Sequence, residues 1–209
     1  MWPDSQETQE LLRRAEAGDA DAINNLMDRH RDSLRQMVNL RMDQAIAGRV
    51  DASDVVQDVL WEASRRLEDY IKEPSMPFHL WLRQLAKDRM VDMHRRHRGA
   101  QRRSVDRENP LQAAASPEAS GFDWGGQLPD GELTPAAANI RRELEQRFLA
   151  ALNQLDEDDR DIILMRHYEH LGNGEVATAL NITPAAAGMR HLRALKKLRS
   201  ILGESGSGS

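Results

Sequence analysis

Apolar residues recur every three or four positions along most of this 209-residue chain, which is the spacing that places them on one face of an α-helix. No segment shows the strict alternation of apolar and polar residues that is typical of a β-strand. The pattern predicts an all-α protein. The expected helices cover residues 11–17, 20–41, 54–70, 77–99, 139–153 and 175–180, with two more that begin after Asp156 and at Pro184.

The periodic pattern stops between residues 104 and 138, where Pro, Gly, Ala and Ser dominate. We interpret this segment as a linker. It separates two predicted helical domains, 1–103 and 139–203, and residues 204–209 form an expected flexible tail.

Polar residues mark several of the expected helix starts. Ser53 is a suitable N-cap for the helix over 54–70. Asp156 and Asp159 have the spacing of a capping box, and Thr183 precedes Pro184, a residue favoured in the first turn of a helix. Two prolines in residues 71–77 predict a loop.

The segment 76–103 combines an apolar face with a dense run of cations. Phe78, Leu82, Leu85 and Met93 recur at helical spacing, Trp81 and Val91 fill the same face, and Gly99 is expected to end the helix. Five arginines follow: Arg95, Arg96, Arg98, Arg102 and Arg103. Such a segment predicts a rigid basic helix that binds a polyanion. In the alternative interpretation the helix end is solvated, and its arginines only complement the helix dipole.

Residues 175–199 have the pattern of a helix-turn-helix: a short helix, a tight break at Asn181, and a longer basic helix from Pro184. Val176, Leu180, Ile182 and Ala187 are expected to form its small core, and residues 190–199 carry five cations and no acid. This favours DNA binding over an ordinary antiparallel helix pair.

Composition narrows the function further. The formal net charge is −5, so the two basic segments are islands on an acidic chain and suggest two contacts with one polyanion. The chain has no cysteine, which excludes disulfides, thiolate zinc sites and cysteine nucleophiles. No apolar run approaches the length of a membrane span and no signal-peptide core is present, so we expect a cytoplasmic protein without membrane insertion.

Two other functions fit parts of the pattern. A conventional helix-turn-helix regulator would bind DNA on its own, but it does not explain a second basic segment. A metal hydrolase would need ligands from the seven histidines, and no set of acids completes a ligand group beside them. These histidines are His30, His79, His94, His97, His167, His170 and His191.

Four segments, in this order, resemble the second and fourth regions of bacterial sigma factors of the extracytoplasmic-function (ECF) group. The first two are DVVQDVLWEASRRL (54–67) and FHLWLRQLAKDRMVDMHRR (78–96). The others are LNQLDEDDRDIILMRHYEHL (152–171) and NGEVATALNITPAAAGMRHLRALKKLR (173–199). The resemblance covers about residues 19–103 and 140–202, and the HRRHRGAQRR ending is similar to a planctomycete-type branch.

The resemblance implies an alternative transcription initiation factor rather than an enzyme, with no cofactor and no metal. Its expected partners are core RNA polymerase, promoter DNA and an anti-sigma factor. Asp54, Gln57 and Asp58 match positions that dock onto the clamp helices of the polymerase, and an exposed acid-amide-acid trio suits a basic helical partner. Leu164, Met165 and Tyr168 are candidates for the polymerase flap tip or for the core.

The same resemblance implies DNA contacts in both regions. Expected −10 residues are Tyr70, Lys87, Asp88, Arg95, Arg96 and Arg98; Asp88 stands where the family usually has Asn, which changes the expected base preference. Expected −35 residues are Thr183, Ala185, Ala186, Arg190, Arg193 and Lys197. Gly188 stands where the family often has a basic residue, so we expect few direct base hydrogen bonds and more phosphate, methyl or shape readout.

Overall fold

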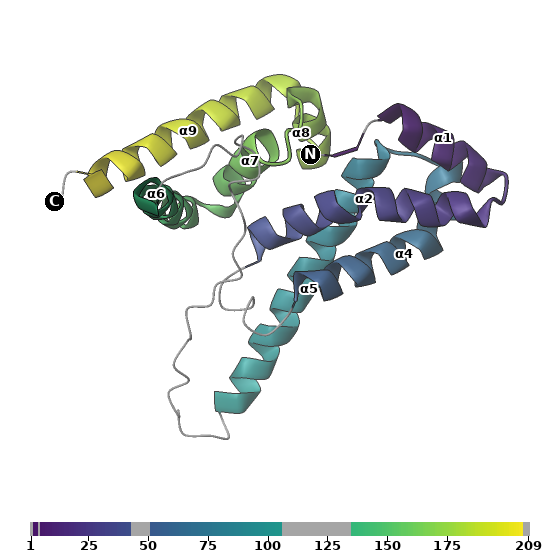
Figure 1. Ribbon diagram of the computed structural model, residues 1–209, viewed down its shortest axis with the longest axis horizontal. Coiled ribbons are helices and arrows are strands. Elements are labelled where there is room, and N and C mark those ends of the chain that lie inside the picture. Colours follow the sequence, from purple (N-terminus) through teal and green to yellow (C-terminus); the bar gives the residue numbers. More distant parts are fainter. Residues whose placement is uncertain (1, 4, 43–50, 106–134, 207–209) are drawn as a thin grey trace. The chain divides into compact units, whose positions relative to one another are not determined.

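The computed structural model describes residues 2–3, 5–42, 51–105 and 135–206, and every regular element in these ranges is an α-helix (Figure 1). The predicted all-α class is therefore confirmed. The chain divides into two compact units, Met1–Gly121 and Phe122–Ser209. The finer domain limits given above stay predictions.

The first unit contains α1 (Ser5–Glu16), α2 (Ala20–Arg41), α4 (Ala52–Lys72) and α5 (Phe78–Val105). Helix α2 packs against the other three helices of the unit. Each helix contributes one apolar face to a shared core, whose burial supplies most of the stability of such a bundle. Central members of this core include Leu26, Leu34, Met37, Val55, Val59, Ala63 and Leu82.

Two helix starts in this unit are capped by aspartates. Asp19 accepts hydrogen bonds from the backbone N–H groups of Asp21 and Ala22, at 3.0 and 3.1 Å, and so begins α2. Asp51 accepts from the N–H of Ser53 at 2.8 Å, so the predicted N-cap at Ser53 is wrong by two residues. The carboxylate of Asp51 is favoured there because it also complements the positive end of the helix dipole.

Several other predicted boundaries also move outward, including the starts of α1 at Ser5 and of the helix Pro135–Asn153. Helix α4 continues to Lys72, which shortens the predicted loop, and α5 continues past Gly99 to Val105. A single glycine weakens a helix without ending it when good helix formers such as Ala100 and Gln101 follow. Val91, predicted on the apolar face of α5, is 37% exposed.

Aromatic rings fix the connection between α4 and α5. Tyr70 stacks on Trp81, with ring centroids 4.7 Å apart, and meets Phe78 edge-on at 5.4 Å. The Tyr70 hydroxyl donates a hydrogen bond to the carbonyl oxygen of Met76 at 2.9 Å. Burial raises the pKa of the Tyr70 phenol. The hydrogen bond to Met76 therefore attaches the loop to the core just before α5 begins.

A buried histidine lies beside this cluster. His30 on α2 is 1% exposed, and its ring contacts Phe78 edge-on at 5.1 Å. Its Nε2 lies 3.2 Å from the hydroxyl oxygen of Thr8 on α1. Burial, reinforced by His79 and Arg29, lowers the pKa of His30 to about 4. The first unit therefore holds this imidazole in its neutral form at neutral pH.

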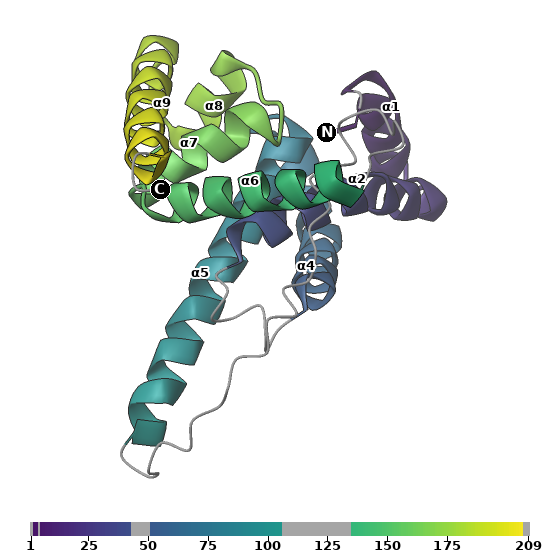
Figure 2. The ribbon, with the colours of Figure 1, turned by 60° about the vertical axis from the view of Figure 1, so that its left-hand side comes forward.

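The second unit contains α6 (Pro135–Asn153), α7 (Glu157–His167), α8 (Asn173–Leu180) and α9 (Pro184–Gly206). Helices α6, α7 and α8 all contact α9, the long terminal helix in Figure 2. Asn181 ends α8 in the left-handed conformation, with φ 53° and ψ 47°, as its position in the predicted turn requires. Asparagine tolerates these dihedrals better than most residues.

Polar contacts set the start of α9. The Thr183 hydroxyl oxygen accepts a hydrogen bond from the N–H of Ala186 at 3.2 Å, which confirms the predicted cap. The Asn173 side-chain amide donates to the carbonyl oxygen of Pro184 at 2.8 Å and so connects the first residues of α8 and α9. Val176 and Ala187 are fully buried as predicted, whereas Leu180 and Ile182 are half-buried.

We predict that the first unit loses stability as the pH falls from about 6.5 to about 4. The unfolded chain takes up a proton at His30 in this range and the folded chain does not, so the free energy of unfolding falls by roughly 3 kcal/mol. His30→Gln should remove most of this dependence. Urea unfolding at a series of pH values, followed by near-UV circular dichroism of the aromatic cluster, measures it.

Exposed His170 provides the matched control, and His170→Gln should keep the wild-type dependence. The same pH dependence in His30→Gln and in the wild type would show that His30 is not its source.

Candidate protein and nucleic-acid interfaces

The first candidate surface is the exposed side of α4. Asp54, Gln57 and Asp58 are all exposed, because the neighbouring Val55, Val56 and Val59 occupy the opposite, buried side of the helix. The structure therefore brings the three predicted polymerase-binding residues together. Asp58 also forms an ion pair with Arg89 of α5, so its charge is partly compensated.

An exposed tryptophan extends this surface. Trp61 lies one turn beyond Gln57 and Asp58 and is 62% exposed, and the guanidinium of Arg65 lies 4.7 Å from its ring centroid. Large exposed aromatic residues with a stacked arginine are typical of protein interfaces. The helical spacing from Gln57 already contained this signal, but the sequence analysis did not include Trp61. We call Asp54, Gln57, Asp58, Trp61 and Arg65 the α4 face.

The second candidate surface is the basic end of α5. Arg95 and Arg96 are exposed, and the helix extends as a rod beyond α2 and α4 (Figure 1). Asp88 is exposed and Lys87 is half-buried on the preceding turns. The side chain of Arg98 lies outside the described residues.

Tyr70, expected at the −10 element, belongs to the core. It is buried, and Trp81 and Phe78 cover its ring. One face of the ring already stacks on Trp81, and a −10 contact of Tyr70 stays a prediction. Tyr70 holds the α4–α5 loop through its bond to Met76.

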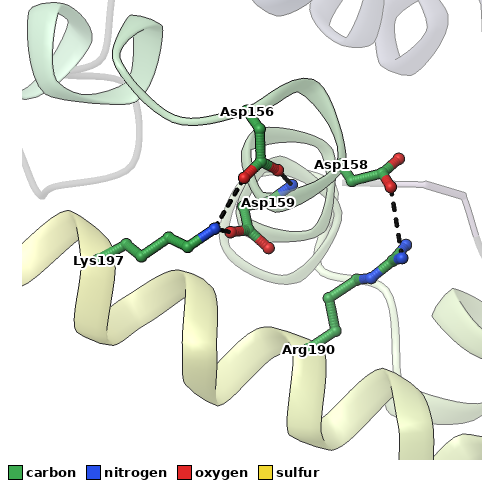
Figure 3. Close-up of polar contacts among 5 residues, drawn as sticks. All are labelled: Asp156, Asp158, Asp159, Arg190 and Lys197. Atoms are coloured by element: carbon green, nitrogen blue, oxygen red, sulfur yellow. Dashed lines mark hydrogen bonds and ion pairs between the residues drawn. The ribbon is translucent and has the colours of Figure 1, made fainter.

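The third candidate surface is on α9, where neighbouring cations have different environments. Lys197 lies between two acids at the start of α7: its ammonium group donates to the N-cap Asp156 at 2.7 Å and also pairs with Asp159 (Figure 3). Its hydrogen bonds to these two carboxylates raise the pKa of Lys197. In turn, the hydrogen bond from Lys197 and the cap bond from the Asp159 N–H lower the pKa of Asp156.

Arg190 is also paired within the unit, with Asp158 at 3.3 Å (Figure 3). The sequence analysis grouped Arg190 and Lys197 with the DNA-binding residues. In the structure both cations also pair with acids at the start of α7, and their −35 roles stay predictions. Because this turn carries several acids at a helix N-terminus, the pairs hold α7 against α9.

The opposite side of α9 is exposed and combines apolar residues with cations. Its exposed members follow the alternating steps of three and four that define one helix face. We call this set the outward face of α9: Ala185, Met189, Leu192, Arg193, Lys196 and Arg199. Ala186 is also exposed at its edge. Lys196 and Arg199 were not among the predicted −35 residues, although their spacing from Leu192 placed them there.

Other candidates belong to the interior of the second unit. Leu164 and Met165 are fully buried, so they form core rather than a surface for the flap tip. Tyr168 is half-buried, and burial raises its pKa.

His167 and His191 face each other with their Nε2 atoms 3.0 Å apart. Among the residues that the structure describes, no group of three or more His, Cys, Asp or Glu could hold a metal ion.

Comparison with known families identifies both units. The family model described as Sigma-70 region 2 matches residues 26–100, and the model described as Sigma-70, region 4 matches residues 145–198. Together they cover more than half of the chain. The chain belongs to the sigma-70 family. The matched ranges include the α4 face, Arg95 and Arg96 of α5, and the outward face of α9 except Arg199.

The relatives of this sigma factor span almost its whole length. The RNA polymerase sigma factor NccH of Alcaligenes xylosoxydans xylosoxydans is 28% identical over 202 residues, covering 93% of this chain and 94% of the relative. The ECF sigma-E factor of Escherichia coli K12 is 26% identical over 186 residues, covering 89% of each. This protein is therefore an alternative sigma factor of the ECF group, which directs RNA polymerase to promoters.

Solved structures show the same fold. CnrH, solved in complex with the cytosolic domain of CnrY, aligns with a TM-score of 0.60 at 22% identity, covering 95% of this chain and 98% of that one. The sigma factor RpoE, solved with the anti-sigma factor NepR from Bartonella quintana, aligns with a TM-score of 0.52 at 20% identity, covering 83% and 91%. Within its described residues, this sigma factor has no helix long and apolar enough to cross a membrane.

We predict that two adjacent lysines contribute differently, Lys196 to promoter binding and Lys197 to the stability of the α7–α9 contact. Lys196→Met should lower the affinity of the holoenzyme for promoter DNA and reduce the slope of log K against log salt by about 0.9, because one phosphate contact is lost. Lys197→Met should leave that slope unchanged and instead speed hydrogen exchange of the α7 and α9 amides, because it releases Asp156 and Asp159.

Salt titrations of promoter binding and hydrogen-exchange mass spectrometry measure the two effects. Each lysine variant is the control for the other. A reduced salt slope in Lys197→Met alone would show that the inward pairing does not persist on DNA.

Proposed function

We propose that the α4 face binds the clamp helices of core RNA polymerase. The observation that supports this most directly is the exposure of Trp61 in the middle of a polar face. The acids Asp54 and Asp58 would attract a basic helical partner, and the Trp61 ring would supply the apolar anchor that such interfaces need.

We infer that the two basic surfaces hold promoter DNA. Arg95 and Arg96 are exposed on α5 and would neutralise phosphates near the −10 element. Strand opening would follow from binding energy, with an extruded base trapped beside the α4–α5 loop at an unstacking cost of a few kcal/mol. The outward face of α9 would enter the major groove at the −35 element.

We further propose that this sigma factor acts in the cytoplasm, without catalytic activity of its own, and that an anti-sigma factor regulates it. The RpoE structure was solved with an anti-sigma factor. On α6 of this chain, Ile140 and Leu144 are exposed one turn apart. An apolar pair of this kind suits the apolar side of an inhibitory protein.

Transcription with purified bacterial core polymerase tests the polymerase contact. Adding this protein to core polymerase and a pool of promoter fragments should produce new start sites. Asp54→Ala plus Gln57→Ala, and separately Trp61→Ala, should reduce their yield at least tenfold, because truncating an interface anchor costs about 2 kcal/mol or more. Pull-down of core polymerase by each variant distinguishes lost association from lost initiation.

Arg66 is exposed on the same helix but lies away from the α4 face, so Arg66→Ala is the matched control and should transcribe normally. Full activity of Trp61→Ala would exclude Trp61 from the interface. Tight binding to a palindrome without polymerase would support a conventional regulator instead.

Removing two cations of α5 tests the −10 contact. Arg95→Ala plus Arg96→Ala should weaken promoter binding by the holoenzyme and reduce the salt slope by about 1.8, since about two phosphate contacts are lost. Titrations between about 50 and 200 mM salt measure it. The double variant Arg13→Ala plus Arg31→Ala changes exposed arginines of α1 and α2 and should keep the wild-type slope. An unchanged slope in the α5 variant would contradict the contact.

A further inference from the structure

The outward face of α9 presents large apolar side chains to solvent where a DNA-reading helix usually offers hydrogen-bond donors. Met189 is 59% exposed and Leu192 is 54% exposed, and Ala185 and Ala186 precede them in the first turn. Exposed apolar residues that cluster on one face usually mark a binding site. The core does not account for them, because α9 packs through Ala187, Ala194 and Leu198 on its other side.

Hydrogen-bond donors are scarce in the same turns. Residues 184–189 are Pro, Ala, Ala, Ala, Gly and Met, none with a polar side chain. Arg190 is the first polar side chain, and it is paired with Asp158 of α7. Thr183, just before the helix, uses its hydroxyl oxygen as the cap for the Ala186 N–H. Bidentate recognition of guanine or adenine therefore has no donor set in the first two turns.

The glycine at position 188 is not forced by lack of space. A Cβ atom placed there would meet only the Asn173 side-chain oxygen, at an ordinary contact distance of 3.8 Å. A residue with a Cβ atom would therefore be accommodated at this position. Close packing therefore does not explain why position 188 lacks a polar side chain.

Cations around the apolar residues indicate the kind of partner. Arg193, Lys196 and Arg199 are exposed on the same face, and residues 184–203 include no acid. A polyanion satisfies these cations through its phosphates, whereas an apolar protein partner would leave them unpaired. The edges of DNA bases offer one apolar group in the major groove, the 5-methyl group of thymine.

We propose that this sigma factor recognises its −35 element through thymine methyl groups, which Met189 contacts directly with Ala185 and Leu192 beside it. This inference rests on the proposed placement of α9 in the major groove. It assigns specificity to apolar contact, while Arg193, Lys196 and Arg199 hold the phosphates without discriminating between bases. The −35 element must then contain an A·T base pair opposite Met189.

Replacing thymine by deoxyuridine tests this, because the change removes the methyl group and keeps every hydrogen-bonding atom of the base. Holoenzyme affinity is measured on a promoter in which each −35 thymine of either strand is replaced in turn. At the thymine opposite Met189, affinity should fall about fourfold, the effect of losing one buried methyl group. Deoxyuridine elsewhere in the element should have little effect.

A double-mutant cycle assigns the methyl contact to Met189. Met189→Ala should weaken binding to the thymine promoter and lose its sensitivity to deoxyuridine at the facing position. Met189 is exposed, so the variant should keep its fold, which circular dichroism checks. Arg193→Ala is the matched control: it should weaken binding equally on both DNAs and reduce the salt slope by about 0.9.

Each other outcome overturns the inference in a recognisable way. If polymerase-dependent start sites appear but no deoxyuridine substitution lowers affinity, the methyl readout is wrong and the proposed function stands. If Met189→Ala reduces polymerase binding while promoter affinity is unchanged, the face binds protein. If wild-type protein yields no polymerase-dependent transcription, the proposed function fails and this inference fails with it.

Discussion

Each helix of this sigma factor must give one face to the core of its unit, and this constraint decides which residues remain for partners. On α4, burial of Val55, Val56 and Val59 turns Asp54 and Trp61 outward. On α9, burial of Ala187, Ala194 and Leu198 turns Met189 and Lys196 outward. The apolar pattern therefore specifies the interfaces as well as the cores, because a helix rotated by a single residue would expose a different set.

Electrostatics refines this division within the second unit. Lys196 and Lys197 are adjacent in the sequence, but a step of about 100° along a helix separates their directions. Lys197 compensates the carboxylates of Asp156 and Asp159 at the start of α7, and Lys196 remains exposed. Pairing Arg190 and Lys197 with acids at the start of α7 compensates part of the positive charge of α9. The remaining cations lie around an apolar centre.

The sequence predicted the helices, their order and several caps because those features depend on local chemistry: Asn181 and Thr183 behave as their residue types require. Boundaries were less accurate where two acceptable signals competed, as Asp51 and Ser53 did at the start of α4. The burial of Tyr70 was not predicted because it depends on Trp81 and Phe78, and periodicity on one helix cannot reveal how residues of another cover it.

Cation pairing was hidden for the same reason. The run over residues 190–199 contains no acid, so no local pattern indicated that Arg190 and Lys197 would pair with residues some 30 to 40 positions earlier. Trp61 is different, since helical spacing from Asp54 and Asp58 was sufficient to place it on the exposed face. Local patterns therefore locate surfaces well, and tertiary contacts decide which members of a surface stay available.

A DNA-reading helix with few donors has an energetic consequence for the whole protein. A contact with one thymine methyl group is worth about 0.8 kcal/mol, whereas a bidentate base pair contact gives about 1–3 kcal/mol of discrimination. Recognition through α9 alone would therefore separate promoters weakly. Joining it in one chain to the proposed DNA contact on α5 would multiply the two modest selectivities, since binding at one site raises the effective concentration at the other. An apolar reading face on α9 is therefore consistent with the presence of a second basic surface in the same chain.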